Sequence, residues 1–68
     1  MIRTDLLKGI IAEKETSQRA VAKHLGITEK TFYSKMKKGV FDSDEISQMI
    51  TLLSIKNPVE IFFATKVT

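Results

Sequence analysis

The segment from Ser17 to Gly39, SQRAVAKHLGITEKTFYSKMKKG, constrains the fold of this chain most, because it contains start and stop signals for two short helices. Ser17 and Thr28 are typical N-cap residues, since their hydroxyls can accept hydrogen bonds from the unpaired amides at a helix start. Gly26 and Gly39 can adopt the left-handed conformation in which helices commonly end. The segment therefore predicts two short helices joined by a tight glycine turn.

Each of these two helices has an apolar face. Val21 and Leu25 are four positions apart in the first, and Phe32 and Met36 are four positions apart in the second. Residues at this spacing lie on one side of a helix, so the two faces can pack against each other. This arrangement is a helix-turn-helix, and double-stranded DNA is therefore the first partner to consider.

Two further helices are predicted on the two sides of this segment. A stripe of apolar residues at helical spacing predicts a helix from about Thr4 to Lys14, and its members are Leu6, Leu7, Ile10 and Ile11. Asp42 and Glu45 have the spacing of a capping box. The apolar stripe after them predicts another helix and consists of Ile46, Met49, Ile50 and Leu53.

A short last helix is predicted after Asn57. Asn57 would cap this helix, Pro58 would occupy its first position, and Glu60 would lie in its first turn. The sequence has neither an alternating strand pattern nor an internal repeat. We therefore predict an all-α fold of five helices that forms a single domain over residues 1–68.

The segment SQRAVAKHLGITEKTFYSKM resembles the DNA-reading unit of the Cro and repressor family, the lambda-repressor-like helix-turn-helix regulators of phages and bacteria. The later NPVEIFFA segment looks like the last helix of small phage-type members. Lys35 departs from the family pattern, which usually has an apolar residue three positions after the one matched by Phe32. We expect the aliphatic stem of Lys35 to cover the edge of the core while its ammonium group stays in water.

The resemblance implies a sequence-specific regulator that binds operator DNA as a dimer and inserts its third helix into the major groove. Five positions match those at which the family reads bases: Thr28, Glu29, Lys30, Tyr33 and Ser34. Lysine can donate to guanine, glutamate can accept from cytosine, and a tyrosine ring or threonine methyl can contact a thymine methyl. Glu29 has a second interpretation, as a favourable charge at the N-terminus of the helix.

Basic residues are concentrated in the half of the chain that holds the helix-turn-helix. Residues 1–38 contain nine Lys or Arg against four Asp or Glu, whereas residues 39–68 contain two against four. The candidates for phosphate contacts are Gln18, Lys35, Lys37 and Lys38. Gln18 matches a phosphate anchor of the family. If each subunit of a dimer neutralises about four phosphates, the log–log dependence of affinity on salt has a slope of roughly −7.

A homodimer is expected because of the apolar segment VEIFF, residues 59–63. Val59, Ile61, Phe62 and Phe63 point around most of a short helix, so they cannot all face one small core. In one interpretation Val59, Phe62 and Phe63 close the core, which leaves Ile61 and the tail, residues 64–68, for self-association. The candidate residues of the dimer or partner interface are Ile61, Phe62 and Phe63.

An enzymatic function is not expected. The chain has no cysteine, its one histidine, His24, has no carboxylate or thiol arranged near it in sequence, and no glycine-rich phosphate loop occurs. We therefore expect no metal and no cofactor. No apolar run approaches the roughly 18 residues that span a bilayer, so we expect a cytoplasmic protein with no membrane partner. The alternative function is that of a modulator, anti-repressor or antitoxin that binds a partner repressor or a toxin.

Overall fold

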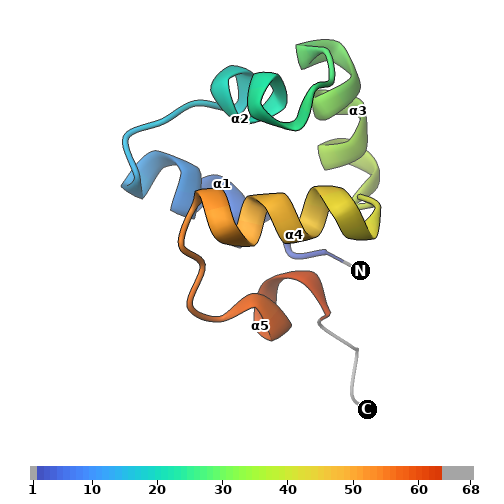
Figure 1. The fold of residues 1–68 in the computed structure, drawn as a ribbon. Helices are drawn as coiled ribbons and strands as arrows, with labels where there is room; N and C mark the ends of the chain where they lie inside the picture. The colour runs from blue at the N-terminus through green and yellow to red at the C-terminus, as the bar shows by residue number, and fades with distance from the viewer. Residues whose placement is uncertain (1, 64–68) are drawn as a thin grey trace.

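The computed structural model describes residues 2–63 and confirms the all-α prediction, since these residues form five helices and no strand (Figure 1). The helices are α1 (Thr4–Glu13), α2 (Gln18–Leu25), α3 (Glu29–Lys38), α4 (Ser43–Leu52) and α5 (Pro58–Phe62). Helix α1 ends one residue before the predicted Lys14. No helix within residues 2–63 is both long enough and apolar enough to cross a membrane.

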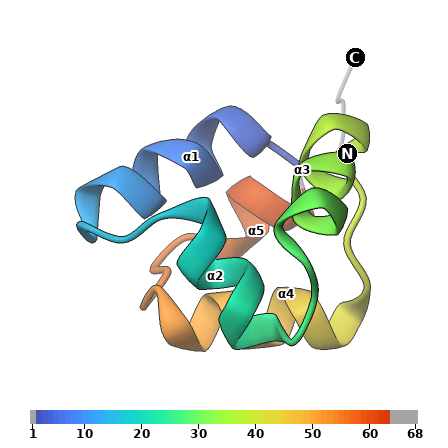
Figure 2. The same ribbon diagram turned by 90° about the horizontal axis from the view of Figure 1, so that it is seen from above.

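The five helices surround one core. Helices α1 and α4 form its two sides. In the view of Figure 1, α2 covers the core from above and α5 covers it from below. Helix α3 closes one end (Figure 2). The side chains that are buried in this core are Ile2, Leu7, Ile11, Val21, Ala22, Phe32, Met36, Phe41, Met49, Leu53, Ile55, Ile61 and Phe62. They include members of every apolar stripe that the sequence predicts.

Three of the four predicted helix caps are present. The hydroxyl of Ser17 accepts from the Ala20 amide at 3.1 Å, and that of Thr28 accepts from the Thr31 amide at 3.1 Å. Asp42 begins a complete capping box at the start of α4. One part of the prediction for Asn57 is wrong: it occupies the N-cap position of α5, with Pro58 and Glu60 in the first turn as predicted, but its side chain makes no cap hydrogen bond. Its amide group donates to Glu60 Oε2 at 2.9 Å.

The predicted exposure of Ile61 is also wrong. Ile61 is fully buried, and Phe62 beside it is only 5% exposed. The reason is that α5 packs against α1 and the residues before it, where the Arg3 amide donates to the Ile61 carbonyl at 2.7 Å. Val59 and Phe63, on the outer side of α5, are 68% and 56% exposed. Of the three candidates for the dimer interface, only Phe63 is therefore at the surface. The tail also predicted for self-association, residues 64–68, lies outside the described residues.

Candidate nucleic-acid interface

Helix α3 presents a polar face to the outside because its apolar face is anchored in the core. Phe32 and Met36 are buried, so residues on the other side of the helix point outward. The exposed residues there include Lys30, Ser34 and Lys37. Three of the predicted contact residues therefore lie together on one accessible surface.

The hydroxyl of Thr28 caps the N-terminal end of α3. It accepts from the Thr31 amide and also donates to the Thr31 hydroxyl at 2.8 Å. Its side chain nevertheless lies at the surface. The Thr28 methyl group is therefore accessible, while the hydroxyl holds the N-terminal end of α3.

Glu29 and Tyr33 form a hydrogen-bonded pair one turn apart on α3. The Tyr33 hydroxyl donates to Glu29 Oε2 at 2.7 Å. This hydrogen bond raises the pKa of the Tyr33 phenol above its usual range, because it stabilises the protonated form next to a negative charge. Tyr33 and Glu29 thus form one hydrogen-bonded unit, and Tyr33 also lines a hollow with residues of α1.

A basic hollow lies beside this pair, where α1, α2 and α3 meet. It has a volume of about 470 Å³ and is lined by Thr4, Lys8, Gln18, Tyr33, Met36 and Lys37. Lys8 comes from α1, Gln18 begins α2, and Lys37 lies in the last turn of α3. Neither lysine forms an ion pair with any residue within 2–63. We call this surface the basic hollow.

Lys8 is the residue that the sequence analysis missed at this site. Gln18 and Lys37 were predicted as phosphate contacts, and the fold brings them together with Lys8. The excess of basic residues in the first 38 positions was the only signal that included Lys8. Its position beside α3 depends on how α1 packs, which no local pattern specifies.

Lys35 lies on the opposite side of α3. Two positions correspond to about 200° of rotation around a helix, so Lys35 and Lys37 cannot serve the same surface. The Lys35 ammonium group contacts both carboxylate oxygens of Glu45 on α4, at 2.7 and 2.6 Å. The Lys35 side chain is 29% exposed, so its ammonium group pairs with Glu45 in a partly buried position, which the sequence did not predict. Lys38 is exposed and remains available for a phosphate contact.

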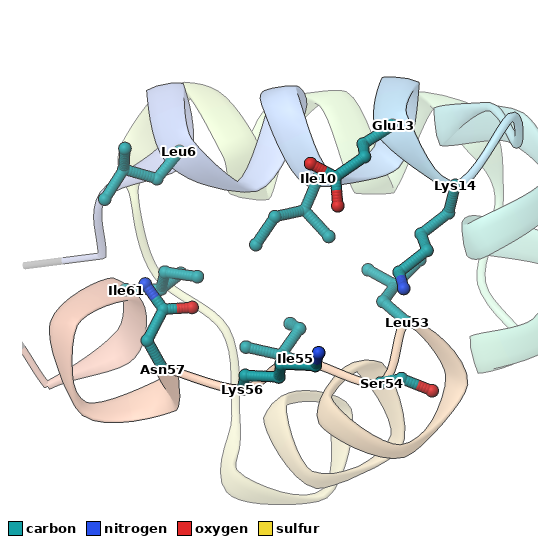
Figure 3. Close-up of a pocket in the computed structure, with 10 residues that line it drawn as sticks. All are labelled: Leu6, Ile10, Glu13, Lys14, Leu53, Ser54, Ile55, Lys56, Asn57 and Ile61. Atoms are coloured by element: carbon teal, nitrogen blue, oxygen red, sulfur yellow. The ribbon is translucent and has the colours of Figure 1, made fainter.

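Two other hollows have different chemistry. The one in Figure 3 has a volume of about 340 Å³ and lies between α1 and the segment after α4. Its rim carries Glu13, Lys14 and Lys56, so charges of both signs surround it, and its floor consists of Leu6, Ile10, Leu53, Ile55 and Ile61. Such mixed charge is less favourable to a polyanion than the basic hollow.

The third hollow is an uncharged groove on α4, with a volume of about 250 Å³. Its lining residues are Ser43, Ile46, Ser47, Ile50, Thr51 and Phe63. None of these side chains is charged, and none of them lines the basic hollow. We call this surface the uncharged groove.

Groups suited to metal binding do not gather in the described part of the chain. Within residues 2–63, no three His, Asp or Glu side chains approach one another as metal ligands do. His24 is exposed on α2.

Comparisons of this chain with protein-family models, with curated proteins and with solved structures found no match. The case for a nucleic-acid interface therefore depends on the residues just described.

Proposed function

We propose that this protein is a sequence-specific, DNA-binding transcription regulator of the lambda-repressor-like helix-turn-helix type, which acts in the cytoplasm as a homodimer. The observation that supports this most is the basic hollow beside the outward face of α3. A surface for phosphate and a surface for base edges are thereby adjacent, as major-groove binding requires.

The basic hollow has the chemistry to hold the DNA backbone. Lys8 and Lys37 supply two positive charges from two different helices, and the Gln18 amide group supplies neutral donors. Gln18 is also the first residue of α2, where unpaired backbone amides and the helix dipole favour an anion. Contacts of this kind would fix the position of α3 in the groove without reading sequence.

The outward face of α3 would read the bases. Lys30 can donate to guanine, and the Ser34 hydroxyl can donate or accept. Glu29 Oε2 accepts from Tyr33, which leaves Oε1 of the same carboxylate to accept from the amino group of cytosine. Tyr33 would then orient Glu29 as well as present its ring to a thymine methyl.

The test is a fluorescence-anisotropy titration at several salt concentrations. The protein is titrated against a duplex enriched from a randomised library and against a scrambled duplex. We expect at least about a thousandfold preference for the enriched duplex. The salt slope should be roughly −7, as for about four phosphate contacts in each subunit of a dimer. Equal, weak binding to both duplexes with a slope near zero would contradict the proposal.

Charge reversal identifies the surface that binds. Lys30→Glu with Lys37→Glu should abolish binding to the enriched duplex, because both positions then repel phosphate. Lys14→Glu with Lys56→Glu is the matched control, since it changes the net charge equally on the rim of the hollow in Figure 3. Circular dichroism verifies that both variants fold. A control variant that loses as much affinity as the first would place the contact elsewhere.

A second function, the binding of a partner repressor or toxin, is supported by the uncharged groove. Phe63 is 56% exposed beside Ile46 and Ile50, which gives an apolar surface without charges. A modulator of this kind would retain partner binding in the Lys30→Glu, Lys37→Glu variant. The same variant therefore separates the two functions.

A further inference from the structure

One ion pair connects α3 to the rest of the fold. Lys35 Nζ lies 2.7 Å from Glu45 Oε1 and 2.6 Å from Glu45 Oε2. Among the side chains of residues 2–63, this is the only hydrogen-bonded contact that joins two different helices. It is therefore the one polar side-chain contact described here that ties the outward-facing helix to its neighbour.

The Glu45 carboxylate is held from two sides. Glu45 is only 6% exposed, so its carboxylate has lost most of its contact with water. Oε1 also accepts from the backbone amide of Asp42 at 3.0 Å, as the second half of the capping box. A carboxylate fixed in this way at the start of α4 offers Lys35 a rigid partner.

The position of this pair determines what it controls. Phe32 and Met36 hold α3 to the core through apolar contacts, and such contacts have little directional preference. Lys35 lies on one flank of the helix, whereas Tyr33 and Lys37 lie on the flank that faces the basic hollow. A directional contact on the Lys35 flank therefore limits rotation of α3 about its own axis.

We propose that Lys35 is a positioning residue, which through Glu45 fixes the rotation of α3 and so aligns Lys30, Ser34 and Lys37 with DNA without itself contacting phosphate. This inference rests on the proposed function.

The test compares three variants with the native protein. Lys35→Met with Glu45→Met removes the pair without changing net charge and fills the same space with apolar groups, so it is expected to fold. It also removes the Glu45 half of the capping box, whose loss acts on the start of α4, and the hydrogen-exchange readout therefore compares α3 with α2. Lys35→Arg retains the ion pair and serves as the conservative rescue. Lys37→Met removes a lysine of the basic hollow. Thermal unfolding first verifies that each variant is folded.

Two DNA measurements distinguish positioning from phosphate contact. In the Met/Met variant, we expect the preference for the enriched over the scrambled duplex to fall about tenfold, comparable to the loss of one base contact. Its salt slope should remain that of the native protein, whereas Lys37→Met should make the slope of a dimer less steep by about 2. Lys35→Arg should keep the native preference. A Met/Met variant with native preference, or with a slope reduced as in Lys37→Met, would overturn the positioning role.

A measurement without DNA separates this inference from the proposed function. In the Met/Met variant, the ratio of the amide exchange rate in α3 to that in α2 should rise about tenfold over the ratio in the native protein. The reason is that α3 has lost its directional contact, whereas α2 has not. Unchanged relative exchange would overturn the inference. If the native protein binds both duplexes equally, the DNA function fails, and the exchange experiment still decides whether the pair fixes α3.

Discussion

At the scale of single residues, the Tyr33–Glu29 pair links the surface of α3 to a measurable proton equilibrium. Tyr33 is 47% exposed, yet its hydroxyl donates to a carboxylate oxygen at 2.7 Å. The hydrogen bond favours the protonated phenol, and the negative charge of Glu29 acts in the same direction. The two residues therefore behave as a unit, in which a change to one is felt by the other.

We predict that Tyr33 titrates above the usual range of tyrosine and that Glu29→Gln lowers its pKa towards that range. Because the pKa of Tyr33 is raised in the folded state, its hydrogen bond to Glu29 stabilises the folded protein fully at a pH below the unfolded-state pKa. This contribution to the free energy of unfolding is lost as the pH rises through the folded-state pKa. The chain has one tyrosine and no tryptophan, so ultraviolet absorbance of tyrosinate reports on Tyr33 alone. An identical titration in the native protein and in Glu29→Gln would contradict the hydrogen bond.

At the scale of helices, two kinds of helix end occur in this fold. Helices α2 and α3 end at glycines in the left-handed region, Gly26 with φ 78° and Gly39 with φ 71°. Near the ends of α1 and α4, two other residues have positive φ: Glu15 with 56° and Ser54 with 49°. A side chain in this region is sterically strained, so the glycine ends are the unstrained ones.

This difference predicts opposite effects for two substitutions. Gly26→Ala should reduce the free energy of unfolding by about 1 kcal/mol, because a Cβ there is strained by the backbone conformation. No other atom lies within 4 Å of that Cβ, so the loss comes from the backbone alone. Ser54→Gly should raise the free energy of unfolding by about 0.5 kcal/mol. The relief of backbone strain in the folded state exceeds the entropy that a glycine loses on folding. Thermal unfolding measures both, and a change of the same sign in the two variants would contradict this explanation.

At the scale of the whole molecule, two surfaces of different chemistry are separate. The basic hollow is built by α1, α2 and α3, whereas the uncharged groove is built by α4 and Phe63. Two copies could meet through uncharged grooves without burying any charge from the lining residues. Such a dimer would not cover the basic hollows, because the two surfaces share no lining residue.

We predict that the protein forms a dimer in sedimentation experiments at high concentration and that Phe63→Ser makes it monomeric. Val40→Ser is the matched control, because Val40 is also an exposed apolar residue, at 64%, but does not line the uncharged groove. The dimer should persist in this control. A monomeric native protein, both with and without operator DNA, would contradict the homodimer.

The positions of the helices could be predicted from the sequence because their causes are local. Ser17, Thr28 and Asp42 start helices through hydrogen bonds that span three residues. The buried faces followed from residues three or four positions apart, such as Phe32 and Met36. The same helical periodicity puts Lys30, Ser34 and Lys37 on the side of α3 opposite Phe32 and Met36. The prediction that these residues bind DNA stays a prediction.

Only the tertiary structure decided how residues from different helices meet. Lys8 joins Gln18 and Lys37 because α1 packs beside the start of α2 and the end of α3. The Lys35 ammonium group has a partner because α4 brings the Glu45 carboxylate within 2.6 Å of it. Ile61 is buried because α5 lies against α1. The physical reason is the same in each case: local hydrogen bonds and periodicity determine where a helix begins and which side is apolar, whereas the neighbour of a surface residue depends on packing across the whole core.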